Sequence, residues 1–352
     1  MAERSQQAAP RPAAGGRAPG ISPRRTRAWP QRHTYAALDL GTNNCRLLIA
    51  RPEGDGFVVV DAFSRIVRLG EGLAATGRLS DAAMDRAVEA LAICAEKLKR
   101  RHVTLVRSVA TEACRRATNG ADFIGRVARE TGIRLEIITA EQEARLAVIG
   151  CHALLEPGDG PALVFDIGGG STELVLLAEG DAPVPEVEDW FSAPWGVVSL
   201  SESEPHVGAN EAELRIAYAR MKQRATDAFA PFAARLVAAA KRPGRLLGTS
   251  GTVTTLASLH LDLPSYDRKK IDGLIVASDD LRAVNHRLAG LSIDERATLR
   301  CIGTERADLV VAGCAILEAI LDLWPAERLS VADRGIREGI LRGLMAADAV
   351  PA

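Results

Sequence analysis

The sequence lacks the features that mark membrane proteins and thiol-bound metal sites. No apolar run approaches the roughly 18 residues that a transmembrane helix requires, and the formal net charge of the 352-residue chain is only −1 at pH 7. The six cysteines include no C-x-x-C pair, and the six histidines include no H-E-x-x-H motif, so neither zinc nor a redox dithiol is indicated. We therefore expect a soluble chain with no membrane partner and no specific nucleic-acid partner. Any polyanion must be held by a local group of basic side chains.

The first 32 residues differ in composition from the rest of the chain. They are rich in Ala, Pro, Gly and Arg and contain a single acidic residue, Glu3, so residues 1–32 are predicted to form a disordered basic tail. The pair Arg24 and Arg25 is not followed by the apolar segment of a twin-arginine export signal, and we expect a cytoplasmic protein. The tail could contact a polyanion, but a solvated linker is the simpler interpretation.

The remaining chain has the composition and length of a globular protein with two domains. Overall, 47% of the residues are apolar and 25% are charged, which allows a sizeable core. Three helix starts are recognisable from capping residues: Ser80 before a helix that reaches about Arg101, Thr139 before the helix that contains Glu141, and Asn210. The helical region after Asn210 is expected to reach about Ala240, with an interruption at Pro231.

The most informative stretch is the segment 163–177. An apolar run enters, three consecutive glycines (168–170) turn the chain, and a second apolar run leaves, so the segment predicts two strands joined by a tight loop. Glycines leave successive backbone N–H groups unshielded, and such groups suit phosphate oxygens. Asp166 would repel a phosphate directly, and a metal ion or its water shell would resolve that conflict. The alternative is a plain glycine hairpin with a solvated aspartate.

The segment 35–50 repeats this design. It again contains a strand, an Asp-x-Gly sequence at Asp39 and Gly41, a small polar loop and an outgoing strand. Two hairpins of one design indicate a duplicated domain with a phosphate loop in each half. A third glycine turn, at 248–251, leads from a strand into a helix, and a helix N-terminus at such a turn is a ready anion site.

These motifs carry a family resemblance. The paired Asp-x-Gly loops resemble those of the actin, sugar kinase and heat-shock chaperone superfamily. The fuller pattern of residues 39–43, 141–145 and 166–173 resembles the exopolyphosphatase and guanosine pentaphosphate phosphohydrolase (Ppx/GppA) family. The resemblance implies an α/β fold with two ribonuclease H-like (actin-like ATPase) domains flanking a cleft. The expected domains are 33–162 and 163–328, followed by a terminal strand and helix (329–352) whose helix packs back on the first domain.

The resemblance also implies roles for individual residues. Glu143 would be the catalytic base, and Asp39 and Asp166 would hold Mg²⁺. The substrate phosphates would be bound by residues of the two loops and one arginine: Gly41, Thr42, Asn43, Arg115, Gly168, Gly169, Gly170, Ser171 and Glu173.

Helix geometry bears on the choice of the base. Glu141 and Arg145 are four residues apart and share a face, as a salt bridge requires. Glu143 lies about 200° from Glu141 around the helix axis and is therefore free for another role. Glu141 remains the main rival as the base, and a helix-surface position remains the alternative for Arg115.

The function implied is hydrolysis of the terminal phosphate of inorganic polyphosphate, with Mg²⁺ and a glutamate base. One alternative is a guanosine pentaphosphate 5′-phosphohydrolase, which would link the protein to the stringent response. Another is a non-catalytic sensor of polyphosphate or (p)ppGpp. A sugar or acetate kinase is disfavoured, because the sequence offers no obvious adenine or sugar pocket. A homodimer is implied by the resemblance alone.

Overall fold

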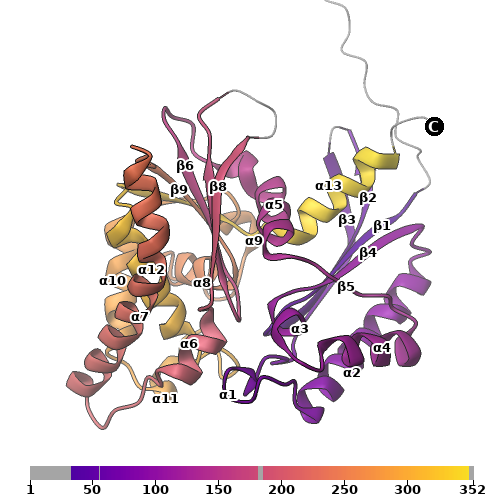
Figure 1. Ribbon diagram of the computed structural model, residues 1–352, viewed down its shortest axis with the longest axis horizontal. Coiled ribbons are helices and arrows are strands. Elements are labelled where there is room, and N and C mark those ends of the chain that lie inside the picture. Colours follow the sequence, from indigo (N-terminus) through magenta and orange to yellow (C-terminus); the bar gives the residue numbers. More distant parts are fainter. Residues whose placement is uncertain (1–32, 55, 181–184, 349–352) are drawn as a thin grey trace, which may run out of the picture.

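The computed structural model describes residues 33–54, 56–180 and 185–348. The predicted basic tail, residues 1–32, therefore lies outside the described residues. Figure 1 shows two α/β halves side by side, each built on a twisted β-sheet that carries helices.

The first half contains a five-stranded sheet within the described residues. Its strands are β1 (Tyr35–Leu40), β2 (Asn44–Glu53), β3 (Gly56–Ile66), β4 (Leu105–Ala110) and β5 (Glu136–Ile137). The order is β3-β2-β1-β4-β5. Strands β1 to β3 form an antiparallel meander, whereas β4 and β5 run parallel to β1.

The second half repeats this arrangement with one additional edge strand. Its strands are β6 (Ala162–Ile167), β7 (Thr172–Leu177), β8 (Val187–Ala193), β9 (Arg245–Thr249), β10 (Ile275–Ala277) and β11 (Arg328–Ala332). The order is β10-β11-β9-β6-β7-β8. Strands β6 to β8 form the meander, and β9 and β11 run parallel to β6. The fold class predicted from the sequence, with two ribonuclease H-like domains, is confirmed.

The helices follow the same division. The first domain carries α1 (Leu73–Thr76), α2 (Asp81–Arg100), α3 (Glu112–Arg116), α4 (Gly120–Thr131), α5 (Ala140–Cys151) and a short 3₁₀ turn (His152–Leu154). The second carries α6 (Val197–Ser203), α7 (Glu211–Ala238), α8 (Gly251–His260), α9 (Arg268–Ile271), α10 (Ser278–Ala289), α11 (Ile293–Ala297) and α12 (Val310–Leu323), and its strand β11 is followed by α13 (Ile336–Asp348). Within the described residues, no helix combines the length and apolar composition needed to cross a membrane.

The three predicted helix starts are confirmed. The side chains of Ser80, Thr139 and Asn210 each accept a hydrogen bond from the first turn of their helix. The predicted interruption at Pro231 is wrong, because α7 continues through it to Ala238. Proline removes one backbone hydrogen bond, but the flanking Phe229 and Phe232 are fully buried against Trp324. Side-chain burial on both sides of the proline outweighs the lost bond.

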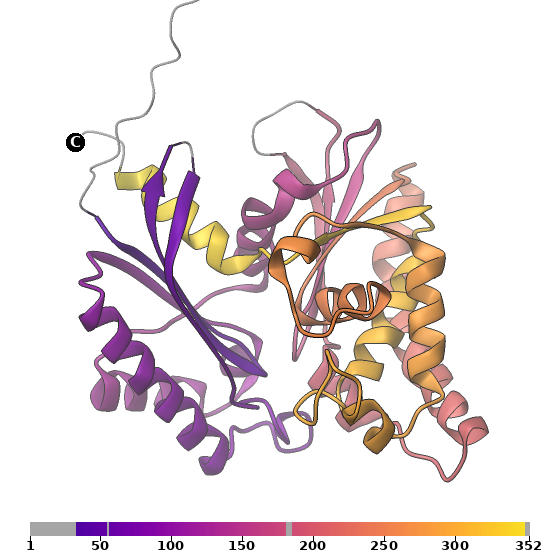
Figure 2. The same cartoon turned by 180° about the vertical axis from the view of Figure 1, so that it is seen from behind.

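Helix α13 joins the two domains. It follows β11 of the second sheet but packs on the first sheet, where Ile340 and Leu341 share a buried cluster with Tyr35 and Ala37 of β1. Figure 2 shows this helix, in yellow, crossing from the middle of the molecule to the first sheet. The terminal helix therefore ties the second sheet to the first.

Glycines allow α13 to pack directly on α5. A Cβ at Gly339 would lie 2.0 Å from the carbonyl oxygen of Leu146, and one at Gly150 would lie 2.0 Å from that of Gly335. Both obstructing atoms belong to the backbone, so they cannot move aside as a side chain would. Backbone contact between these two helices thus depends on the absence of two methyl groups.

This contact generates a stability prediction. We expect Gly339→Ala to lower the free energy of unfolding by about 1–3 kcal/mol, because the added methyl group overpacks a backbone contact. Gly343 on the same helix has nothing within 4 Å of its Cβ position, so Gly343→Ala should be neutral or stabilise by up to about 1 kcal/mol. Urea unfolding of the two variants beside the wild type provides the measurement. Equal midpoints for the two variants would contradict the proposed packing.

Candidate active site

The two sheets place their equivalent loops against each other. The β1–β2 loop and the β6–β7 loop meet at a cleft of about 970 Å³, including its part open to solvent. The β9–α8 turn forms a third wall through Ser250, Gly251 and Thr252. Of the residues predicted for the site, only Arg115 is not among those that line the cleft: Asp39, Gly41, Thr42, Asn43, Glu143, Asp166, Gly168, Gly169, Gly170, Ser171 and Glu173 do.

The two loops are closed by the same hydrogen bond. The N–H of Gly41 donates to the carbonyl of Asn44 at 2.9 Å, and the N–H of Gly168 donates to the carbonyl of Ser171 at 2.9 Å. In the part of the chain that the structure describes, the N–H groups inside each loop donate to no protein acceptor; these are the N–H groups of Thr42, Asn43, Gly169, Gly170 and Ser171. Unused N–H groups on successive residues are suited to phosphate oxygens.

Glycine is required in the second loop for space. A Cβ at Gly169 would lie 2.9 Å from the Cβ of Thr42 and 3.0 Å from the backbone nitrogen of Asn43. A Cβ at Gly170 would lie 2.7 Å from the Thr42 hydroxyl oxygen. Neither glycine has a positive φ. Their small size, rather than an unusual backbone conformation, therefore allows the two loops to touch.

The charges that line the cleft are unbalanced. Among its described lining residues, the carboxylates are Asp39, Glu112, Glu143, Asp166 and Glu173, whereas the guanidinium groups are Arg46 and Arg306. Arg306 also donates to the hydroxyl of Thr255 at 3.3 Å. A polyanion entering this cleft would meet more negative than positive side chains. Its binding requires either protonated carboxylates or an additional cation.

The two aspartates occupy equivalent positions on the central strands. Asp39 lies opposite Arg46 in the β1–β2 ladder, and Asp166 lies opposite Glu173 in the β6–β7 ladder. Burial and the neighbouring carboxylate of Glu173 raise the pKa of Asp166 to about 8, although Arg46 opposes the shift. Burial also raises the pKa of Asp39. One oxygen of Asp39, Oδ1, is buried and has no hydrogen-bond partner.

Glu143 points into the cleft from helix α5. Its side chain is almost fully buried, and its Oε2 accepts a hydrogen bond from Arg115 Nη1 at 3.1 Å. Burial, and after it the charge of Glu173, raise the pKa of Glu143 well above its ordinary value, with Arg115 opposing the shift. Glu173 is held by the hydroxyl of Ser192 at 2.8 Å, but burial still raises its pKa.

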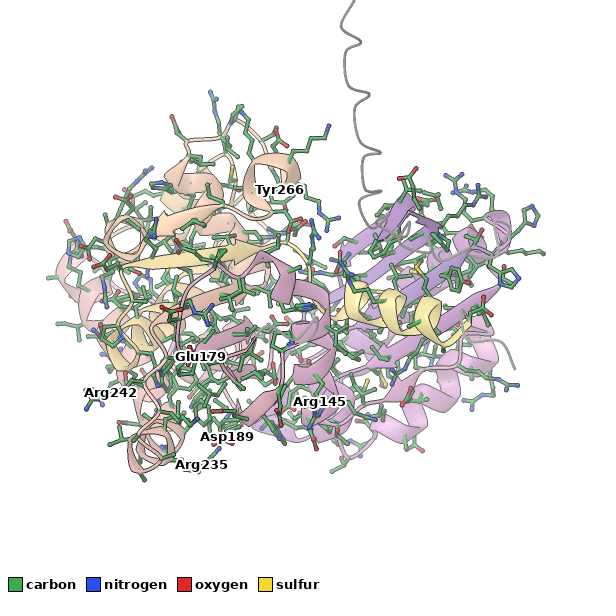
Figure 3. The ribbon with its side chains drawn as sticks, turned by 90° about the horizontal axis from the view of Figure 1, so that it is seen from above. Arg145, Glu179, Asp189, Arg235, Arg242 and Tyr266 are labelled. Carbon is green, nitrogen blue, oxygen red and sulfur yellow. The ribbon has the colours of Figure 1, made fainter. Side chains whose placement is uncertain are left out.

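Glu141 lies on the other face of the helix, as its spacing from Glu143 predicts. It pairs with Arg145 at 3.0 Å, and both side chains are about half exposed. In Figure 3 Arg145 extends from α5 to the outside of the molecule. Glu141 does not line the cleft, so the geometry favours Glu143 over its rival as a group that can reach a substrate.

Arg115 sits behind the acidic residues. Its guanidinium donates to Glu112 at 2.5 Å, to Glu143 at 3.1 Å and to the carbonyl of Ile138 at 2.8 Å. These contacts orient Glu143, and the structure does not test the phosphate contact predicted for Arg115. That role stays a prediction.

The residues fit a magnesium ion that binds together with a substrate. Among the described residues, no group of three or more His, Cys, Asp or Glu side chains could hold a metal ion. Mg²⁺, however, commonly uses only one or two carboxylates and completes its shell with water and substrate phosphates. Asp39 and Asp166 supply two hard oxygen ligands, and the unpartnered Oδ1 of Asp39 matches that use.

Sequence reasoning overlooked several lining residues. Arg46 lies on the outgoing strand of the first loop, and strand pairing alone could have put it opposite Asp39. Glu112 and Thr255 carry no comparable signal, because their contribution depends on how helices α3 and α8 meet the loops.

Comparison with known proteins identifies one family, which is the family that the sequence motifs resemble. Residues 48–347 match the model of the Ppx/GppA phosphatase family. The chain is 34% identical over 324 residues to exopolyphosphatase 2 of Mycobacterium tuberculosis, covering 88% of this chain and 98% of that protein. It is 31% identical to the guanosine-5′-triphosphate,3′-diphosphate pyrophosphatase of Aeromonas hydrophila, covering 88% of this chain but only 59% of that protein.

Solved structures agree with this assignment. A crystal structure of an exopolyphosphatase from Cytophaga hutchinsonii superposes with a TM-score of 0.79 at 25% identity, covering 90% of this chain and 98% of that one. A Ppx/GppA family member from Aquifex aeolicus superposes with a TM-score of 0.71 at 28% identity, covering 91% and 99%.

The buried acids generate a prediction about stability and pH. Because the pKa of Asp166 is about 8 in the folded chain, the folded state holds a proton that the unfolded state has lost between about pH 4 and pH 8. The contribution of Asp166 to the free energy of unfolding therefore falls as pH rises through this window. We expect metal-free Asp166→Asn to melt several degrees above the wild type at pH 9, and this difference should shrink toward pH 5.

Thermal unfolding over this pH range tests the expectation. Asp159→Asn is the control, because Asp159 is an exposed loop residue away from the cleft. An Asp166→Asn difference that stays constant with pH would contradict the assigned burial effect.

Proposed function

This chain belongs to the Ppx/GppA phosphatase family, and we propose that it hydrolyses the terminal phosphoanhydride bond of inorganic polyphosphate. The observation that carries the proposal is a buried glutamate, Glu143, that faces two glycine loops whose N–H groups are unused. The similarity to exopolyphosphatase 2 of M. tuberculosis, over nearly the full length of that protein, supports the choice of substrate.

The chemistry assigns a separate task to each group. The unused N–H groups of the loops would bind the oxygens of the terminal phosphate and stabilise the charge that they carry in the transition state. Glu143 would take a proton from the attacking water as the water oxygen bonds to phosphorus. The bridging P–O bond then breaks, and the shortened polymer leaves with the bridging oxygen as an anion. Phosphoryl transfer depends mainly on such positioning and electrostatic stabilisation.

The acidic lining supports a requirement for Mg²⁺. Asp39 and Asp166 would hold the ion, which when bound would neutralise charge on the phosphate oxygens. A cation at this position would also lower the raised pKa values of the neighbouring carboxyl groups, so Glu143 would be ionised and able to accept a proton. Arg115 would keep Glu143 oriented through their hydrogen bond.

A second candidate substrate is guanosine pentaphosphate. The Aeromonas relative named for that reaction supports it, and the same loops and base would serve, since the bond broken is again a terminal phosphoanhydride. This chain spans only 59% of that relative, whereas it spans 98% of the exopolyphosphatase of M. tuberculosis. A sensor that binds either ligand without turnover is the third possibility. A homodimer, a cytoplasmic location and a part in the stringent response stay predictions.

Phosphate release tests the substrate and the base together. The purified chain is offered long polyphosphate and guanosine pentaphosphate separately, with Mg²⁺. We expect release from polyphosphate, and Glu143→Gln should lower kcat by about 10² to 10⁴, the usual contribution of a general base, while polyphosphate still binds. Glu141→Gln is the matched control, because it changes the same residue type on the exposed face of the same helix.

Each other outcome has a definite meaning. Release from the nucleotide alone would replace the proposed substrate with guanosine pentaphosphate. Binding without release from either compound would establish the sensor and refute the enzyme. Equal losses in Glu141→Gln and Glu143→Gln would reject Glu143 as the base.

Metal removal provides an independent prediction. A chelator should abolish phosphate release, and added Mg²⁺ should restore it. Asp39→Asn should raise the Mg²⁺ concentration needed for half-maximal rate, because one of the two expected carboxylate ligands is lost. Full activity in the chelator, measured after dialysis, would contradict the proposed metal role.

A further inference from the structure

A second, smaller cavity adjoins the cleft near the junction of β11 and α13. Its volume is about 350 Å³, including its part open to solvent, and it shares part of the cleft wall, including Asp39, Arg46 and Asp166. The rest of its lining comes mainly from the β11–α13 junction, including Arg334 and Arg337. Figures 1 and 2 show the beginning of α13 at this junction, beside helix α9.

Two guanidinium groups in this lining are free of hydrogen bonds. Across the described ranges, neither Arg46 nor Arg337 has a hydrogen bond or an ion pair with any protein group. Arg46 reaches from the first domain toward the second, since its Nη2 is 3.5 Å from the position of a Cβ on Gly251. Burial lowers the pKa of Arg337. The charge of Glu338 opposes this shift, and the nearby charge of Arg46 adds to it. Two positive groups so close together favour an anion between them.

The cations around the cavity are, by contrast, already neutralised. Arg334 pairs with Asp272 at 2.7 Å. Arg268 of α9 pairs with Asp333 at 3.0 Å and with Glu338 at 3.0 Å. The unused positive charge therefore lies inside the cavity. Asp39, Asp166 and Asp333 also line the cavity, and Asp333 pairs with Arg268. A single small anion held between Arg46 and Arg337 would meet fewer carboxylates than an extended polyanion that passed Asp333 and Asp272 on its way out.

We propose that this cavity is a phosphate subsite that receives the orthophosphate released by hydrolysis, held by Arg46 and Arg337. The inference rests on the proposed function and adds a site for its product. Guanidinium groups bind phosphate oxygens through charge-assisted, often paired, hydrogen bonds. Because the subsite shares Asp39 and Asp166 with the cleft, the product can move there from the reacting centre while the shortened polymer stays in the cleft.

Direct binding of inorganic phosphate tests the subsite without any turnover. Isothermal titration calorimetry in Mg²⁺ buffer would compare the wild type, Arg337→Gln, Arg337→Lys and Arg145→Gln. We expect the phosphate dissociation constant to rise about tenfold in Arg337→Gln and less in Arg337→Lys, which keeps the charge. The control Arg145→Gln, on the outer face of α5, should match the wild type. Unchanged phosphate binding in a folded Arg337→Gln protein would overturn the proposal.

Kinetics separates the product from the polymer as the occupant. In Arg337→Gln the inhibition constant of orthophosphate should rise about tenfold, while the KM for polyphosphate stays within twofold of the wild-type value. If the KM rises as much as the inhibition constant, the cavity holds a phosphate of the polymer, and the proposal is wrong. Loss of a desolvated cation should not prevent folding. Melting curves of Arg337→Gln and Arg337→Lys would show whether weaker phosphate binding comes from a misfolded protein.

The two proposals fail in distinguishable ways. Absence of polyphosphate hydrolysis with Arg337-dependent phosphate binding would refute the proposed function and leave an anion site. Hydrolysis with phosphate binding that does not depend on Arg337 would refute the subsite and leave the function.

Discussion

The contact between the two glycine loops is the constraint on which the rest of the site depends. Gly169 and Gly170 approach Thr42 and Asn43 so closely that a single methyl group would separate the loops. This approach brings carboxylates from both domains around one small volume. Helices α5 and α13 hold the domains at that distance by a second backbone contact, again through glycines. Glycines therefore allow close backbone contact at two places in the fold: between the two loops of the site, and where α13 packs on α5.

The buried carboxyl groups of the cleft connect the stability of the fold with its proposed function. Burial raises the pKa values of Asp39, Glu143, Asp166 and Glu173, and the charge of Glu173 adds to the shifts of Glu143 and Asp166. The folded chain without a metal therefore favours the protonated form of these carboxyl groups. In the proposed function, a bound cation would favour the ionised carboxylates and would attract a polyanion. Burying these carboxyl groups opposes stability, as is common where a protein keeps groups for function.

Some features of the fold and of the site could not be predicted from the sequence, because they depend on contacts between distant segments. The break expected at Pro231 does not occur, because the proline penalty is local whereas the burial of Phe229 and Phe232 depends on α12. The guanidinium of Arg115 holds Glu143, a residue on another helix. Arg46 and Arg337 line one cavity although one lies near the start and the other near the end of the described chain.

The sequence by itself determined the fold class, the two loops with their aspartates, and the face of α5 that carries Glu143. The loops and the helix face follow from short-range patterns, namely strand and turn signals, a repeated Asp-x-Gly and helical spacing, whereas the fold class follows from the family resemblance that these motifs carry. Only the tertiary structure decided which charges neutralise one another. Among the described residues, it pairs Arg115, Arg268 and Arg334 with carboxylates and leaves the guanidinium groups of Arg46 and Arg337 without a hydrogen bond or an ion pair. The physical reason is that ion pairing depends on distances of a few ångströms between residues far apart in the chain, and no local pattern encodes those distances.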